Sequence, residues 1–178
     1  MRNLQRAAEL VTSFKQVAAD RASSQRRRFM LHQVAHETQL TLHPMLKRAN
    51  CQVVVDVPAT LQMDSFPGPL GQVIANLIEN AVKHGLDTGG GVITLSARPA
   101  GADMVTISVS DRGKGIAAEL HQHVFEPFYT TRMGQGGSGL GLHIAHNIVY
   151  QILGGSMELT SAAGHGARFD LTVPLSAP

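Results

Sequence analysis

Three glycine- and amide-rich segments follow one another along the chain and limit what it can fold into. The first is the pair Asn76 and Asn80, the second is Asp-x-Gly-x-Gly at residues 111–115, and the third is Gly-x-Gly-x-Gly-Leu at residues 137–142. Short glycine motifs arise often by chance, but the order, spacing and local contexts of these three agree with one another. Together they predict a pocket for a nucleotide.

Composition narrows the class of protein. The 178 residues suit one medium-sized domain with an appendage, and the 43% hydrophobic content is enough for a core. A formal net charge of +2, scattered except at residues 26–28, predicts no nucleic-acid partner. The single Cys51 has no partner for a disulfide or a zinc site, which favours a reducing cytoplasm. No apolar run approaches the roughly 20 residues of a membrane span, so we expect no membrane contact by this segment, although its parent protein could be anchored.

The N-terminal third of the chain reads as helical. Residues 3–27 contain no Gly or Pro and repeat apolar side chains at helical spacing, which predicts one long amphipathic helix. Its apolar stripe has no visible partner in its own segment, which suggests pairing with another helix, for example in a second copy of the chain. The alternative is a helix that lies on its own domain. A second helix is expected at 33–48, interrupted or bent by Pro44.

From residue 50 onward strands and helices alternate in groups. Strands at 53–55 and 61–63 are expected to form a hairpin. Further strands are predicted at 92–97, 105–109, 157–160 and 167–173, and helices at 69–84 and 140–153. The predicted fold is α+β: a two-layer α/β sandwich with a mixed, mainly antiparallel sheet, helices on one face, and the long N-terminal helix in front.

The helix predicted at 69–84 carries the first candidate site residues. Asn76 and Asn80 are four apart and point the same way, so two amide oxygens can reach one ligand, and Mg²⁺ bound to a triphosphate prefers such ligands. Lys83, one turn beyond Asn80, would pair with phosphate oxygens. The alternative for all three is a solvated helix surface.

The two glycine segments suit the two ends of a nucleotide. Asp111 at a strand end could accept a hydrogen bond from the exocyclic amine of adenine; its alternative is an Asp-initiated turn. The glycines from residue 134 to 141 would let backbone amides reach phosphates at the start of the helix near Leu140; the alternative is a merely flexible loop.

Two familiar nucleotide motifs are excluded. Residues 134–139 match a dinucleotide fingerprint, but the required preceding strand is missing because Pro127 interrupts residues 125–129. The chain also has no P-loop. His143 and His146 are interpreted as surface residues rather than metal ligands.

With these motifs in place, the sequence resembles the catalytic ATP-binding domain of sensor histidine kinases, in the superfamily shared with DNA gyrase, mismatch-repair ATPases and heat-shock chaperones. Residues 76–84 look like the N box, 111–115 the G1 box, 125–128 the F box and 137–142 the G2 box. The resemblance covers about residues 29–175, and the combination of motifs is highly specific.

This resemblance implies that ATP and Mg²⁺ are the cofactors. Asn80, with Asn76, would hold Mg²⁺, Asp111 would bind the adenine amine, and Lys83 and His84 would touch the phosphates or the ribose side. Residues 129–138 would form the mobile ATP lid. The full set of expected nucleotide-binding residues is Asn76, Asn80, Lys83, His84, Asp111, Gly113, Gly115, Ile116, Thr130, Thr131, Arg132, Gly137, Ser138, Gly139, Leu140, Gly141 and Leu142.

The catalytic candidates are Glu79 and Lys83. Lys83 would neutralise charge on the γ-phosphate, and Glu79 would orient or deprotonate the accepting imidazole; the alternative for Glu79 is a solvated helix carboxylate. The hydrolysing members of the superfamily carry a glutamate where this sequence has Asn76, which argues against efficient ATP hydrolysis.

The resemblance divides the chain into residues 1–28, the C-terminal part of a dimerisation and phosphotransfer helix, and residues 29–178, the catalytic ATP-binding domain. His36 imitates the phosphate-accepting histidine but lacks the following proline and comes after the long helix, so we interpret it as a solvated helix histidine. The acceptor is expected outside this fragment, which should then be unable to phosphorylate itself. The implied partners are the histidine-containing dimerisation domain of the parent kinase, a response regulator, and a second copy in a full-length homodimer.

The predicted function is therefore transfer of the ATP γ-phosphate to a histidine in a two-component system. Two alternatives stay open. An anti-sigma-type serine kinase uses the same pocket, although the N-terminal helix argues against it. A non-catalytic nucleotide-binding dimerisation module is the other, although intact Asn80, Lys83 and Asp111 argue against loss of nucleotide binding.

Overall fold

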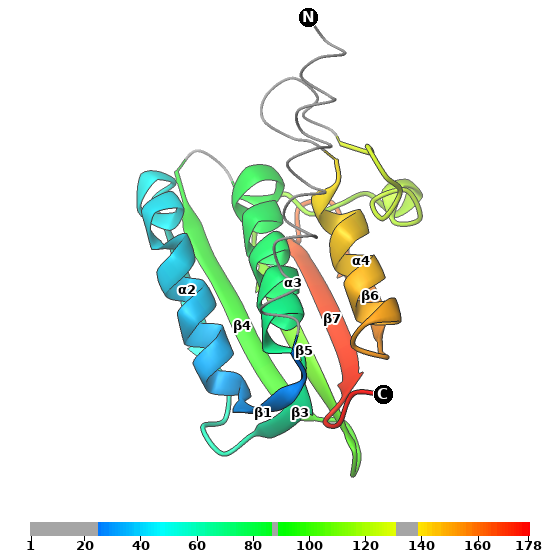
Figure 1. Cartoon of the computed structure of the whole chain (residues 1–178). Helices are drawn as coiled ribbons and strands as arrows, with labels where there is room; N and C mark the ends of the chain where they lie inside the picture. Colours follow the sequence, from blue (N-terminus) through cyan, green and yellow to red (C-terminus); the bar gives the residue numbers. More distant parts are fainter. Residues whose placement is uncertain (1–24, 87–88, 131–138) are drawn as a thin grey trace, which may run out of the picture.

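In the described part of the chain, two layers make up the fold: a five-stranded sheet, and three α-helices that cover one of its faces (Figure 1). The computed structural model describes residues 25–86, 89–130 and 139–178. Within them the elements are β1 (Arg27–Met30), α2 (Leu31–Arg48), β2 (Cys51–Asp56), β3 (Gln62–Ser65), α3 (Pro67–Asn80), the π-helical turn η1 (Ala81–Gly85), β4 (Gly91–Pro99), β5 (Met104–Asp111), the 3₁₀ turn η2 (Ala118–Leu120), α4 (Gly141–Gln151), β6 (Ser156–Ser161) and β7 (Ala167–Pro174).

The large sheet has the strand order β2-β4-β5-β7-β6. β2 pairs with β4 in parallel and all other neighbours are antiparallel. The predicted two-layer fold with a mixed, mainly antiparallel sheet and helices on one face is confirmed.

The core lies between the layers because both kinds of element present an apolar face there. Leu70, Ile74 and Leu77 follow the helical period on α3 and are almost inaccessible to solvent, as are Ile93 and Ile107 on alternate positions of the central strands. Burying such side chains stabilises each by about 1.5–3 kcal/mol relative to exposure. The apolar periodicity of the sequence therefore fixes which face of each element points inward.

The predicted hairpin of the first two strands is wrong. β2 joins the large sheet, with Val53 opposite Ile93, whereas β3 joins β1 in a separate two-stranded sheet, with Phe29 opposite Met63. The separation has a physical reason, because the inward side chains of β2 complete the main core, while β3, which carries the buried Met63, lies at the lower end of the molecule in Figure 1.

The C-terminal end of the predicted N-terminal helix is wrong. Residues 25 and 26 are not helical and Arg27–Met30 form β1, while the rest of that prediction, residues 3–24, lies outside the described residues. Arg26 is held by Asp64, with Nε to Oδ1 at 3.2 Å, and by Ser176. The division into residues 1–28 and 29–178 stays a prediction.

Pro44 does not interrupt the second helix. α2 runs from Leu31 to Arg48 with Pro44 inside it. The carbonyl of Leu40 loses its helical partner at the proline, and Leu40 lies on the exposed side of α2, where water can replace the missing donor.

Candidate nucleotide site

A cleft of about 430 Å³ opens at the end of the helix layer where α3, η1, the segment after β5 and the start of α4 meet. All three sequence motifs contribute to its wall, although they are far apart in the sequence. The predicted site residues that line it are Asn76, Glu79, Asn80, Lys83, His84, Asp111, Gly115, Ile116, Thr130, Gly139, Leu140, Gly141 and Leu142.

The remaining predicted residues fall into two groups. Thr131, Arg132, Gly137 and Ser138 lie outside the described residues. Gly113 is described but does not line the cleft. The described residues 112–130 contain no strand.

Asn76 presents an unpaired polar group beside the cleft. Among the described residues, none accepts a hydrogen bond from its buried Nδ2. A Cβ atom at Gly141 would lie 4.0 Å from Oδ1 of Asn76, so α4 can approach α3 closely at this point. An unpaired buried amide costs about 1–3 kcal/mol, which a ligand or water at this position would recover.

The helix that carries the asparagines ends in a π turn. The N–H of Leu86 donates to the carbonyl of Ala81 at 2.8 Å, a five-residue step, where the sequence had predicted a regular helix to His84. Gly85 then contacts the loop after β5, since its carbonyl accepts from the N–H of Lys114 at 3.0 Å. π turns occur often at functional sites.

Lys83 and Glu79 form an ion pair on the cleft wall. Lys83 Nζ donates to Glu79 Oε2 at 2.6 Å, and the two side chains are 47% and 37% exposed. Because solvent screens both groups, the pair contributes little to folding stability. Its chemical consequence is larger, since the two predicted catalytic residues neutralise one another in this state.

Asp111 is the most deeply buried charged side chain of the cleft, with 8% of its surface exposed. Its Oδ1 accepts from the N–H of Gly113 at 2.8 Å. Burial raises the pKa of its carboxyl group, and hydrogen bonds from the backbone N–H groups of Gly113 and Ala167 offset part of that rise. The carboxylate is thus oriented by the backbone, with acceptor capacity left for the cleft.

The glycines of residues 111–115 allow this loop to pack closely. A Cβ atom at Gly113 would lie 2.0 Å from the carbonyl oxygen of Gly85. Gly115 has a φ of +68°, and a Cβ atom there would lie 1.9 Å from the carbonyl oxygen of Ala162. Any side chain at either position would push the loop away from its neighbours.

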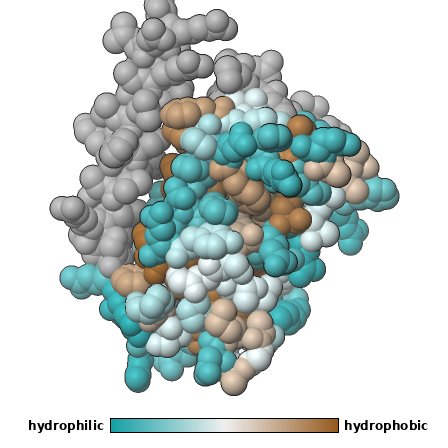
Figure 2. Space-filling view, turned by 90° about the vertical axis from the view of Figure 1, so that its right-hand side faces the viewer, coloured by the Kyte–Doolittle hydropathy of each residue, from teal (hydrophilic) through white to brown (hydrophobic). Residues whose placement is uncertain are grey.

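Sequence reasoning missed much of the cleft wall. The additional lining residues are Gly85, Lys114, Ala117, Leu120, Val124, Tyr129, Ile144 and Ala167. Figure 2 shows apolar atoms between polar ones near the top of the side that carries α4 and the loop after β5. The only signal in the sequence was a scatter of apolar residues between the motifs, which has no recognisable period.

Phe128 adopts an unusual backbone conformation at the edge of the cleft. Its φ is +66°, its side chain is 47% exposed, and its N–H donates to the carbonyl of Gly139 at 2.9 Å. A left-handed φ is uncommon for a bulky residue and marks local strain. The bond joins the chain on both sides of residues 131–138.

The two histidines of α4 were predicted to be surface residues, but both make contacts within the domain. His143 Nδ1 donates to the carbonyl of Phe125 at 3.0 Å, and Asn147 Nδ2 lies 3.1 Å from its Nε2. His146 packs against Phe125, and burial, with a smaller contribution from the charge of His143, lowers its pKa. Among the described residues no group of three potential metal-ligating side chains occurs.

The described helices include none that is both long and apolar enough to cross a membrane.

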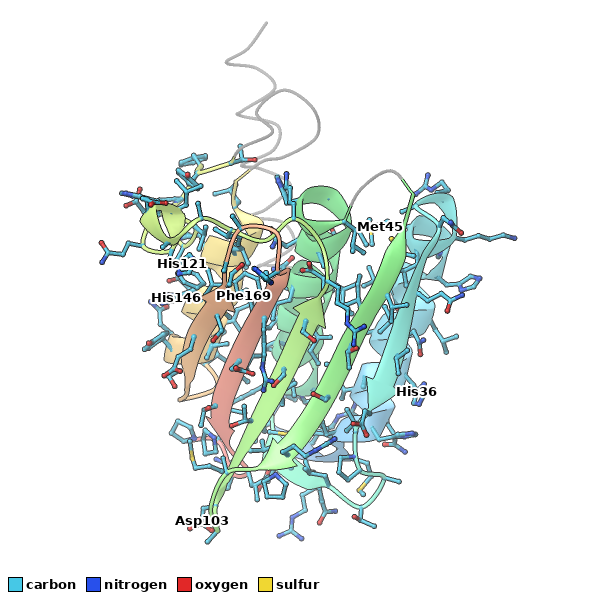
Figure 3. All side chains as sticks on the ribbon, turned by 180° about the vertical axis from the view of Figure 1, so that it is seen from behind. His36, Met45, Asp103, His121, His146 and Phe169 are labelled. Carbon is cyan, nitrogen blue, oxygen red and sulfur yellow. The ribbon has the colours of Figure 1, made fainter. Side chains whose placement is uncertain are left out.

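His36 is exposed on α2, as expected, and Figure 3 shows it at the opposite side of the molecule from His121, His146 and Phe169.

Comparison with known proteins points to one family. A family described as "Histidine kinase-, DNA gyrase B-, and HSP90-like ATPase" matches residues 67–177. The sensor histidine kinase ZraS of Klebsiella oxytoca is 38% identical over 143 residues, which cover 80% of this chain and 30% of that protein. The alginate biosynthesis sensor protein KinB of Pseudomonas aeruginosa is 41% identical over 115 residues, 65% of this chain and 18% of that protein. The chain thus spans less than a third of these relatives.

A solved structure gives the same assignment. The catalytic domain of histidine kinase ThkA, in a nucleotide-free form, superposes with a TM-score of 0.75 at 25% identity, covering 85% of this chain and 97% of that one. The chain therefore belongs to the histidine kinase-, DNA gyrase B- and HSP90-like ATPase family, and within it is similar to the catalytic domains of sensor histidine kinases.

Proposed function

We propose that the chain is the kinase domain of a two-component sensor, which binds ATP and transfers its γ-phosphate to a histidine on a dimerisation domain. The observation that carries the proposal is the meeting of Asn76, Asp111 and Gly139 on one cleft from three distant segments. Buried Asp111 offers a fixed acceptor at one end, and the start of α4 offers backbone N–H groups. These two features suit the adenine and the phosphates of ATP.

The residues present also fit Mg²⁺. Asn76 and Asn80 supply amide oxygens beside the cleft. The Nδ2 of Asn76, which has no acceptor among the described residues, is an N–H donor and would suit a phosphate oxygen beside the ion. Asn80 with Asn76 would hold the ion, which when bound neutralises charge on the phosphates.

Asn80→Ala is expected to reduce ATP affinity in the presence of Mg²⁺ by roughly 10–100-fold, because one oxygen ligand is lost. Calorimetric titration with an unhydrolysable ATP analogue, with and without Mg²⁺, measures this. Gln72→Ala is the matched control, since Gln72 is an amide one turn before Asn76 that does not line the cleft. An equal gain from Mg²⁺ in both variants would contradict the assignment.

Glu79 and Lys83 act on the transferred group under this proposal. Lys83 has to leave Glu79 to reach a phosphate oxygen, and Glu79 is then free to accept the proton of the attacking imidazole. The nucleotide and the ion pair therefore compete for the same lysine.

Glu79→Gln separates these two roles. It removes the charge that holds Lys83, so nucleotide affinity is expected to stay equal or rise a few-fold, whereas phosphotransfer falls about 100-fold if Glu79 serves as the base. Affinity comes from calorimetry and the rate from radiolabelled ATP, with Glu158→Gln on β6 as the control for a lost surface charge. Unchanged transfer would assign Glu79 only a solvated role.

The partners follow from the same proposal. They are the histidine-containing dimerisation domain, a response regulator that receives the phosphate, and a second copy of the full-length kinase, with the catalytic domain on the cytoplasmic side.

The deciding experiment supplies a histidine-containing fragment to the folded chain with ATP and Mg²⁺. Phosphate that appears on the fragment and is released by acid is phosphohistidine and supports the proposal. Acid-stable phosphate would indicate a serine kinase, and nucleotide binding without transfer would indicate a non-catalytic module. GTP serves as the control for adenine selectivity.

A further inference from the structure

Two histidines on α2 lie in contact at a place that the nucleotide cleft does not use. Nε2 of His32 and Nε2 of His36 are 3.0 Å apart, and the two side chains are four residues apart on the helix. His36 is exposed and His32 is half-buried. Residues four apart share one helix face, so the helical backbone itself brings these two side chains together.

The contact joins the nitrogen-bearing edges of the rings. The ring planes are inclined by 67° with centroids 4.3 Å apart, so the rings are not stacked face to face. In the absence of another ligand, one Nε2 must donate its proton and the other accept. A tautomeric shift of the donor ring to Nδ1–H leaves both Nε2 lone pairs free without adding or removing a proton.

The nitrogen separation matches chelation of one metal ion. Two metal–nitrogen bonds of about 2.0–2.1 Å to atoms 3.0 Å apart enclose an angle of roughly 95°. Neighbouring positions of a square-planar or octahedral ion have such an angle, whereas a tetrahedral ion needs a wider one. Imidazole nitrogen and this geometry together favour Cu²⁺ or Ni²⁺ over Zn²⁺.

We propose that His32 and His36 form a two-ligand site for a single Cu²⁺ or Ni²⁺ ion on the outer face of α2. No third His, Cys, Asp or Glu among the described residues completes a larger group, so the other coordination positions remain open to water or to a donor from another molecule. The site is separate from the cleft, since no described residue of α2 lines it.

The test is calorimetric titration of the whole chain with Cu²⁺ alone, combined with electron paramagnetic resonance to count the nitrogen donors. The expected result is one strong site with two nitrogen donors. His32→Ala and His36→Ala should each weaken that site about 100-fold, because the second bond of a chelate forms intramolecularly. Unchanged ADP affinity and circular dichroism establish that each variant is folded.

A rearranged variant gives the matched control. His36→Ala combined with Gln33→His keeps the number of histidines on α2, but neighbouring helix positions do not face each other. His43→Ala, an exposed histidine farther along the same helix, tests for non-specific binding. If the rearranged variant binds Cu²⁺ as tightly as the natural chain, or if the natural chain has no site stronger than the double variant His32→Ala/His36→Ala, the proposal is wrong.

Discussion

Asp111→Asn is expected to lower the affinity for ATP and ADP by about 100-fold, because a hydrogen bond to a charged acceptor is worth roughly 1.5–3 kcal/mol. The backbone N–H of Gly113 bonds the side chain of Asp111 and would select the amide oxygen of the variant. The NH₂ group of the new side chain would then face the cleft. Because this group and the amine of adenine are both hydrogen-bond donors, no hydrogen bond could form between them. Adenine selectivity should fall together with affinity.

The same substitution is expected to leave the ligand-free fold equally or more stable. Burial raises the pKa of Asp111 above its ordinary value of 3.8, so the ionised carboxylate is less stable in the folded than in the unfolded chain. This cost is absent below the ordinary pKa and appears as the pH rises through the raised pKa. The neutral asparagine avoids it, so any gain in Tm should be present at neutral pH and vanish in acid.

Calorimetric titration and thermal unfolding at several pH values measure both effects. As the pH is lowered, the nucleotide affinity of the natural chain should begin to fall at a higher pH than it would if Asp111 had the ordinary pKa of an aspartate. A variant that keeps its nucleotide affinity would show that Asp111 does not contact the base. A variant that loses binding together with its fold would show only that Asp111 is structural.

Gly115→Ala is expected to destabilise the fold by about 3 kcal/mol and to lower Tm by roughly 10 °C, with loss of nucleotide binding. Two costs combine at this position. The φ of +68° is unfavourable for any residue with a side chain, and the new Cβ atom would lie 1.9 Å from the carbonyl oxygen of Ala162. The loop that carries Asp111 would have to move away from the turn between β6 and β7.

Substitutions at two other glycines separate the cost of the positive φ from the cost of the steric clash. Gly101 has a φ of +90°, and a Cβ atom there would meet nothing within 4 Å, so Gly101→Ala should cost only about 1 kcal/mol. Gly89 has open space and no positive φ, so Gly89→Ala should be neutral or slightly stabilising. Thermal unfolding of the three variants tests this order, and a Gly115 variant no worse than the Gly101 variant would refute the steric argument.

Local patterns in the sequence predicted most elements because burial imposes the same period on many residues at once. The stripe that includes Leu70, Ile74 and Leu77 could only be a helix with one inward face. Strand pairing was harder to predict. β1 is four residues long with a single buried side chain, and its stability comes from pairing with β3 more than thirty positions later.

The residues of the site likewise fall into those that the sequence predicted and those that it did not. Polar residues such as Asn76 and Asp111 stand in recognisable motifs, and the structure brings them to one cleft. Leu120 and Val124 complete the apolar part of the wall, but nothing in their own segment distinguishes them from other apolar residues. Their role depends on where η2 packs, which is a tertiary property.

The π turn at Ala81–Gly85 has a consequence for the length of this segment. A π turn contains one residue more than an α-helical turn, so deleting a single residue there would convert it to regular helix and improve the local hydrogen bonding. The deletion would also rotate every later residue by about 100° around the helix axis. If the deleted residue is Ala81 or Val82, Lys83 would leave the wall and the carbonyl of Gly85 would leave the N–H of Lys114, so a chain shortened here should be a better helix and a poorer receptor for ATP.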